Sequence, residues 1–136
     1  MSIGEENKAL VYQFWEELNK GNLGVWDELC SPEYIYHGTA GDSTLEKSKQ
    51  HAAGMLTSFP DLNCSVNEMI AEGNYVANRY TITATHKNTY RGITPMSKQV
   101  IFYGIEINRI ADGKFVETWG ISDTLGLMQQ LGVIPS

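Results

Sequence analysis

The fold is decided by a long alternating stretch, Ile101-Phe102-Tyr103-Gly104-Ile105-Glu106-Ile107-Asn108-Arg109-Ile110, then Ala111-Asp112-Gly113-Lys114, then Phe115-Val116-Glu117-Thr118-Trp119-Gly120-Ile121-Ser122-Asp123. An Asp-Gly pair between two alternating runs is a strong signal for a tight β-hairpin turn. The stretch therefore predicts two long antiparallel strands. One predicted face mixes acids with aromatic residues, which is unusual both for a core and for a surface, so we expect that face to line a pocket.

Pairing across the turn assigns the side chains to two faces. If Ile110 opposes Phe115, the cross-strand partners point to the same side of the sheet. The face that we expect to line the pocket then carries Phe102, Gly104, Glu106, Asn108, Ile110, Phe115, Glu117, Trp119, Ile121 and Asp123. A one-residue bulge would exchange the two faces along part of the hairpin.

The opposite face of this hairpin carries an apolar row made of Ile101, Tyr103, Ile105 and Ile107, together with Arg109, Val116, Thr118, Gly120 and Ser122. Such a row is too apolar for a free surface of a soluble protein. We therefore expect a second copy of the chain to pack there, as a homodimer or possible tetramer.

The remaining segments predict helices first and strands afterwards. Apolar residues at helical spacing favour helices over 5–18, 22–30 and 44–59, and one or two helical turns over 125–131. Residues 33–37, 62–71 and 75–86 favour strands, and 38–43 and 87–98 favour loops. This order predicts one α+β domain spanning residues 1–136, in which helices cover one face of a curved antiparallel sheet.

The composition narrows the possible partners and location. The formal charge of −6 disfavours binding to nucleic acid or to an anionic membrane, since both need a basic face. Cys30 and Cys64 lack the spacing of a zinc site and are expected to be reduced thiols. The sequence shows no signal-peptide pattern and no apolar run long enough to span a bilayer, so we expect a cytoplasmic protein.

The strand predicted over 75–86 contributes a second inner face, with Val76, Asn78, Tyr80, Ile82, Ala84 and His86. Together the two inner faces form an apolar wall that contains a few polar side chains, namely Asn78, His86, Glu106, Asn108 and Asp123. Burying a carboxylate costs several kcal/mol unless it is paired or hydrogen-bonded. A few polar groups that converge in an apolar concavity are typical of a small-molecule site.

The chain also resembles the SnoaL-like polyketide cyclases, which belong to the nuclear-transport-factor-two-like superfamily. The matching stretches cover nearly the whole chain in order: Glu5 to Leu18, Phe59-Pro60-Asp61-Leu62, Ile70-Ala71-Glu72-Gly73, Thr85-His86, Gly92-Ile93-Thr94-Pro95, Ile105 to Ile110, Asp112-Gly113-Lys114, and Trp119 through Asp123 to Gln129-Gln130-Leu131-Gly132. The resemblance implies a cone-shaped α+β barrel around a deep pocket, with dimers formed through the sheet. It also implies an intramolecular aldol condensation without metal or cofactor, in which the aspartate after the tryptophan of the last strand, Asp123 here, is the general acid/base.

This chemistry suggests roles for the residues of the predicted pocket. An aldol closure needs a base that removes a proton α to a carbonyl, and a carboxyl group in an apolar pocket has a raised pKa that suits it to this task. We therefore expect an enzyme that acts on an apolar, carbonyl-bearing small molecule. The expected catalytic residues are Asp123, His86 and Glu106, and the expected substrate-binding residues are Trp119, Phe102, Tyr80, Asn78, His37 and Trp15.

Several alternatives remain open at this point. Asp123 directly precedes Thr124-Leu125 and could simply cap the last helix. Glu106 could lie on an outward face or pair with Arg79 or Arg109. His86 could be a rim or loop histidine, and His37 could be a hydrogen-bonded residue at the entrance. The same pocket would also suit an isomerase, a hydrolase or a binding protein without turnover, and the apolar row alone would suit a pure assembly domain.

Overall fold

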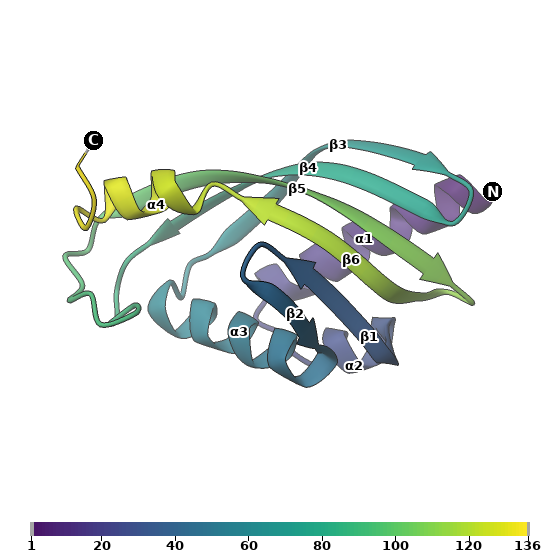
Figure 1. Ribbon diagram of the computed structural model, residues 1–136, viewed down its shortest axis with the longest axis horizontal. Coiled ribbons are helices and arrows are strands. Elements are labelled where there is room, and N and C mark those ends of the chain that lie inside the picture. The colour runs from purple at the N-terminus through teal and green to yellow at the C-terminus, as the bar shows by residue number, and fades with distance from the viewer. Residues whose placement is uncertain (1, 136) are drawn as a thin grey trace.

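The computed structural model describes residues 2–135, which form an α+β fold of four helices and six strands (Figure 1). The predicted fold class, a curved sheet with N-terminal helices, is therefore confirmed. The elements in chain order are α1 (Ile3–Asn19), α2 (Val25–Leu29), β1 (Cys30–Gly38), β2 (Gly41–Thr44), α3 (Leu45–Ser58), β3 (Asn63–Glu72), β4 (Tyr75–Thr85), β5 (Gln99–Ala111), β6 (Lys114–Ser122) and α4 (Thr124–Gln130).

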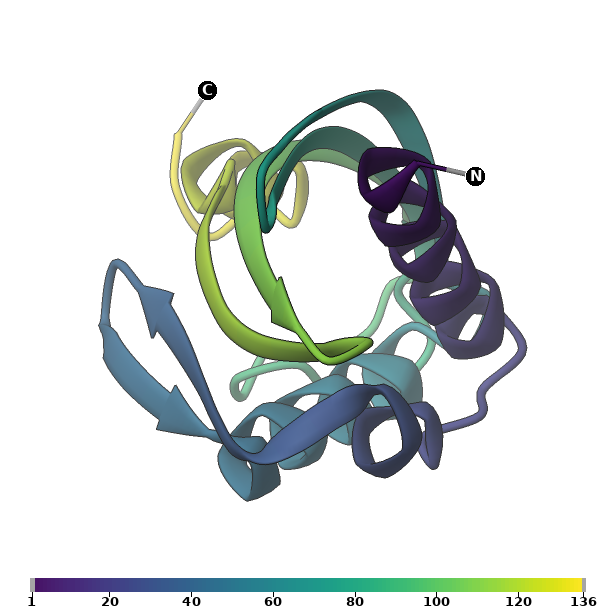
Figure 2. The same cartoon turned by 90° about the vertical axis from the view of Figure 1, so that its right-hand side faces the viewer.

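The strands form one sheet in the order β2-β1-β6-β5-β4-β3. All neighbours are antiparallel except β1 and β6, which run parallel, so the sheet is mixed and the prediction of a purely antiparallel sheet is wrong. Residues 38–43 were predicted as a loop, but Gly41–Thr44 pairs with β1 as a short edge strand. Viewed end-on, the sheet curls into an open arc that faces the helices (Figure 2). The arc does not close, because β2 and β3 remain edges.

The β5–β6 hairpin has the predicted turn and one bulge. Asp112 and Gly113 both adopt positive φ angles, 52° and 72°, as the tight hairpin turn requires. Ile110 pairs with Phe115 as predicted, but Arg109 then pairs with Glu117, so Val116 is an extra residue in β6. Because side chains alternate with a period of two, one extra residue moves every later side chain of β6 to the other face.

The bulge corrects the predicted faces of β6. Thr118, expected on the outer face, is 3% exposed and pairs with Asn108 inside the sheet. Trp119, expected inside, pairs with Ile107 and is 38% exposed. The faces of β4 and β5 are confirmed, since the inner residues of β4 are all buried, namely Val76, Asn78, Tyr80, Ile82, Ala84 and the following His86.

Helices α1 and α3 cover the concave side of the sheet. Ser2 caps α1 by accepting a hydrogen bond from the backbone N–H of Glu5, and Val11, Phe14 and Leu18 form its buried stripe. Helix α1 packs against β3 and β4, and α3 packs against β1 and β2. None of the helices described is both long and apolar enough to cross a membrane.

Candidate functional site

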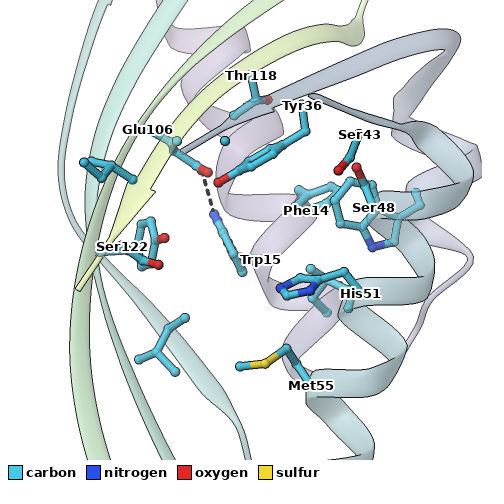
Figure 3. Close-up of a pocket in the computed structure, with 18 of the residues that line it drawn as sticks. Phe14, Trp15, Tyr36, Ser43, Ser48, His51, Met55, Glu106, Thr118 and Ser122 are labelled. Carbon is cyan, nitrogen blue, oxygen red and sulfur yellow. Dashed lines mark hydrogen bonds between the residues drawn. The ribbon is translucent and has the colours of Figure 1, made fainter. Parts of the chain in front are cut away.

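A cavity of about 410 Å³ lies between the concave face of the sheet and helices α1 and α3. Its volume falls in the range of small-molecule sites. Aromatic side chains from α1, α2, β1, β4, β5, β6 and the 87–98 loop line it, and among the described residues a single carboxylic acid lies with them. These aromatic residues are Phe14, Trp15, Trp26, Tyr34, Tyr36, Tyr80, Tyr90, Phe102 and Phe115, and the acid is Glu106. Figure 3 shows Phe14, Trp15 and Tyr36 near this acid.

Two glycines bring tyrosine rings close to Glu106. A Cβ atom on Gly104 would lie 2.2 Å from the hydroxyl of Tyr80, and one on Gly120 would lie 2.2 Å from the hydroxyl of Tyr36. Gly104 lies two residues before Glu106 on the same face of β5, and Gly120 is the β6 partner of Glu106. The missing side chains therefore create the space in which both rings pack against the backbone beside the acid.

A chain of buried hydrogen bonds holds Glu106. Its Oε1 atom accepts from Nδ2 of Asn78 at 3.1 Å and from the indole N–H of Trp15 at 3.3 Å. Behind it, Nδ2 of Asn108 donates to Asn78 Oδ1 at 2.9 Å, and the hydroxyl of Thr118 donates to Asn108 Oδ1 at 2.8 Å. The bulge in β6 is what places Thr118 at the end of this chain.

The surroundings of Glu106 shift its proton equilibrium. The side chain of Glu106 is half-buried in the cavity wall, and this burial raises the pKa of its carboxyl group above the ordinary value of 4.5. The hydrogen bonds from Asn78 and Trp15 act in the opposite direction and offset part of the effect. Burial and the negative charge of Glu106 also raise the pKa values of Tyr36 and Tyr80, so both phenols remain protonated donors at neutral pH.

Four of the predicted site residues line the cavity: Glu106, Trp15, Tyr80 and Phe102. Asn78 is 2% exposed and contacts the cavity acid from behind through its hydrogen bond. The structure thus brings five predicted residues into one group, and it excludes the alternative that Glu106 pairs with Arg79 or Arg109. Those two arginines bind Glu68 and Glu117 instead.

The other predicted site residues lie away from the cavity. Asp123 is exposed at the N-cap of α4, where its side chain accepts a hydrogen bond from the backbone N–H of Gly126 at 2.9 Å. Trp119 stands on the outer face because of the bulge. His86 is 1% exposed and packs against Phe59, 5.4 Å between ring centroids, so it belongs to the core rather than to a rim. The catalytic role predicted for Asp123 stays a prediction, while its position is that of a helix cap.

His37 forms an ionic cluster on the outside of β1. Its Nδ1 lies 2.8 Å from Asp42 Oδ1, and its Nε2 lies 2.8 Å from Glu117 Oε2. Glu117 also accepts from Arg109 at 2.9 Å, and the ring of Trp119 stacks on the imidazole with 5.2 Å between centroids. The cluster joins β2 and β1 to β6 at the single parallel pairing of the sheet. These contacts hold the β1–β2 hairpin against β6, and His37 does not line the cavity, so its predicted substrate contact stays a prediction.

Replacing His37 by Gln should lower the free energy of unfolding in a pH-dependent way, because it removes the ionic contacts between the β1–β2 hairpin and β6. The hydrogen bonds to Glu117 and Asp42 raise the pKa of His37 above 6.5, so its stabilising contribution is full below 6.5 and lost as pH rises through the raised value. The hydrogen bonds from His37 and Arg109 lower the pKa of Glu117, so its contribution is full above 4.5 and lost as pH falls through the lowered value. Denaturant unfolding of wild type and H37Q should differ most between pH 4.5 and 6.5. An unchanged difference at about pH 9 would contradict the ionic nature of the cluster.

Sequence reasoning missed several cavity residues, including Tyr36, Ser48, His51 and Arg91. For Tyr36 a signal existed, because alternation in 33–37 must place Tyr36 and His37 on opposite faces. For His51 the neighbouring Ala52 already belonged to the predicted stripe of α3. Within residues 2–135, no three His, Cys, Asp or Glu side chains are grouped closely enough to hold a metal ion.

Comparisons with known proteins agree with this architecture. The family model of the SnoaL-like polyketide cyclases matches residues 9–131, whereas the search of curated proteins gives no match. Among solved structures, AclR, a proposed hydroxylase from Streptomyces galilaeus, is 30% identical with a TM-score of 0.92, over 98% of this chain and 89% of AclR. IdmH, a proposed polyketide cyclase from Streptomyces antibioticus, is 27% identical with a TM-score of 0.84, over 93% of this chain and 99% of IdmH.

A proposed polyketide cyclase from Acidithiobacillus ferrooxidans is also similar, with 27% identity and a TM-score of 0.83 over 97% of this chain and 98% of that one. The similarity thus extends along nearly the entire length of each of these proteins, and the family model covers all elements of the sheet and the cavity. Since the match spans most of the chain, this protein is a member of the SnoaL-like polyketide cyclase family.

Proposed function

We propose that the protein catalyses an aldol-type reaction of an apolar, carbonyl-bearing small molecule, with Glu106 as general acid/base. One observation carries the proposal: a carboxyl group of raised pKa forms part of the wall of an aromatic cavity. A raised pKa makes the carboxylate a stronger base and keeps the acid form accessible near neutral pH. Family membership supports an enzyme of the cyclase or hydroxylase kind, and the cavity supports the chemistry assigned to this residue.

The hydrogen bonds of Glu106 give its two carboxyl oxygens different roles. Oε1 already accepts from Asn78 and Trp15, so the proton is better carried by Oε2, which is available to a ligand in the cavity. Both donors also fix the orientation of the carboxyl group. Such preorganisation lets a base act without reorienting at the moment of reaction.

The proposed cycle is balanced without any external reagent. Oε2 of ionised Glu106 removes a proton α to a carbonyl, and the C–H bonding electrons form an enolate. The hydroxyls of Tyr36 and Tyr80 stabilise the enolate oxygen. The enolate carbon then attacks a second carbonyl of the same molecule, closing a ring by a C–C bond. The resulting alkoxide takes the proton back from Glu106, so the product is an isomer of the substrate.

The first step can be tested on a simple ketone. In deuterated buffer, 2-tetralone at a concentration that saturates the protein should exchange its α protons faster than in buffer alone, as followed by proton NMR. The enzymatic rate should rise with pH through an ionisation above 4.5, because the carboxylate is the active form. Saturable binding without exchange would overturn the proposal and favour a non-catalytic binding protein.

We further propose that the outer face of the sheet joins two copies of the chain. Ile101, Tyr103, Ile105 and Ile107 are 43–54% exposed, and Ile105 and Ile107 pair with the exposed Ile121 and Trp119 of β6. Soluble monomers rarely expose an apolar patch of this extent.

Replacing Ile105 by Glu should therefore convert the dimer to a monomer. Each copy would bring one negative charge into the apolar contact, and burying these unpaired charges is unfavourable. The mass measured by sedimentation equilibrium at micromolar concentration should halve. Ile3→Glu is the matched control, since Ile3 is similarly exposed, at 58% against 54% for Ile105, but lies on α1 outside this face. A wild-type monomer under these conditions would contradict the interface.

A further inference from the structure

A second cavity adjoins the main one, and Glu106 is not among its lining residues. The adjoining cavity is about 230 Å³ and shares four residues with the main one: His51, Met55, Tyr90 and Arg91. His51 and Met55 extend from α3 into the space across from Glu106 (Figure 3). The junction of the two cavities therefore has an imidazole and a guanidinium group in its wall.

Arg91 is presented there by a tight turn. The backbones of Tyr90 and Ile93 exchange two hydrogen bonds, of 3.1 and 2.8 Å, and Arg91 and Gly92 at the tip both adopt positive φ angles, 48° and 77°. The turn is anchored because Tyr90 is 7% exposed and packs edge-on against Phe59 at 5.3 Å. The guanidinium carbon of Arg91 lies 5.2 Å from the centre of the Tyr90 ring. The turn thus holds the cation at the cavity wall.

The charge of Arg91 has no counterpart in this region. Among residues 2–135, Arg109 and Arg79 each bind a glutamate, whereas Arg91 takes part in no ion pair or hydrogen bond. Glu106, on the far wall, is the only acid among the described residues that line either cavity. The side chain of Arg91 is exposed at the cavity wall, so its guanidinium group is accessible to a ligand and can bind an anion.

His51 suits the same anion as a neutral partner. His51 is partly exposed, and its partial desolvation by the surrounding protein, together with the positive charge of Arg91, lowers its pKa below 6.5, so the imidazole is uncharged at neutral pH and can donate one N–H. It makes no side-chain hydrogen bond to another described residue that would occupy this donor. Arg91 supplies the positive charge, and the neutral His51 adds one N–H donor. Together the two side chains offer three or more N–H donors to one small anion.

We propose that His51 and Arg91 form a carboxylate-binding subsite, so that the ligand is an apolar carbonyl compound with a carboxylate at one end. The planar guanidinium fork matches the two oxygens of a carboxylate. The ligand would then span the cavity, with its carboxylate at the α3 wall and its reacting carbonyl at the Glu106 wall. This inference rests on the proposed function only for the reacting end, since the subsite itself is a property of binding.

Calorimetric titration with 2-naphthoate and its methyl ester tests the subsite, because the two probes share an apolar body and differ in charge. The wild-type protein should bind the acid about tenfold more tightly than the ester. Arg91→Gln should remove that difference by weakening the acid about tenfold while leaving the ester unchanged. Lys98→Gln is the matched control, since it removes a cation from the same loop at a residue that lines neither cavity.

The outcomes separate the subsite from the proposed reaction. The subsite proposal is overturned if the wild-type protein binds the acid and the ester with equal affinity, or binds neither. It is also overturned if R91Q binds the acid as tightly as the wild type does. Retained ester binding shows that R91Q still has a formed cavity. Failure of the proposed function is separate, because it would appear as absence of α-proton exchange on bound 2-tetralone, a ketone that carries no carboxylate.

Discussion

Replacing Glu106 by Gln should reduce the rate of α-proton exchange on bound 2-tetralone by roughly 10² to 10⁴-fold, the usual contribution of a positioned general base. The amide has the same shape as the acid but cannot take up a proton. Its oxygen can still accept from Asn78 and Trp15, so the buried chain of hydrogen bonds is retained. Binding of the ketone should therefore change far less than the exchange rate, and the ratio of the two effects is the measurement.

The stability of E106Q provides an independent check on the same residue. Burial raises the folded-state pKa of Glu106, so ionisation favours the unfolded chain and stability is lost as pH rises from 4.5 through the raised value. Glutamine carries no charge at any pH. In urea unfolding at neutral pH, E106Q should therefore be at least as stable as the wild type. A strongly destabilised variant would indicate that the carboxylate is a structural anchor rather than a base.

Asp123→Asn is the matched comparison, because the family resemblance points to that aspartate. Asparagine is as good a helix N-cap as aspartate, so α4 should remain intact. If Glu106 is the base, D123N should exchange protons at nearly the wild-type rate. The opposite pattern, with D123N inactive and E106Q active, would return the catalytic role to Asp123.

The sequence predicted much of the fold because its strongest signals are local. Asp112-Gly113 between alternating runs marked the hairpin turn, and the pairing of Ile110 with Phe115 is confirmed. The apolar stripe of α1 and the inner face of β4 are also confirmed, since each depends on a simple period. Pairings between distant segments leave no such signal. The parallel contact of β1 with β6 therefore could not be predicted. The edge strand Gly41–Thr44 was missed although it pairs with its neighbour β1, because its residues Gly, Asp, Ser and Thr are typical of a loop.

The candidate site was predicted in part for the same reason. Residues of β4 and β5 were placed correctly, so Glu106, Asn78, Tyr80 and Phe102 were found. Beyond Val116 the bulge reversed the period, which moved Trp119 to the outer face and Thr118 to the inner one. Nothing in the local sequence distinguishes a bulged from a regular pairing there. The positions of His51 and Arg91 at the cavity depend on how α3 and the 87–98 loop fold over the sheet. The periodicity of the sequence carries no information about that arrangement.

Replacing Gly104 by Ala should destabilise the protein by about 1–3 kcal/mol, the typical cost of overpacking a core. The new Cβ would lie 2.2 Å from the Tyr80 ring, and that ring is 7% exposed and packs 5.5 Å from Trp15, centre to centre. The ring must therefore move toward the cavity. Urea unfolding should show the loss of stability, and calorimetry should show weaker binding of methyl 2-naphthoate.

Gly54→Ala is the matched control, because a Cβ at Gly54 in α3 meets nothing within 4 Å. Alanine is a better helix former than glycine, so G54A should be stabilised by roughly 0.5–1 kcal/mol. A double-mutant cycle with Tyr80→Leu isolates the contact, since removing the ring should relieve most of the cost of the Gly104→Ala substitution. An unchanged cost in the Tyr80→Leu background would mean that the strain lies elsewhere in β5. Gly104 would then be needed for the backbone of β5 and not for placing the tyrosine ring beside Glu106.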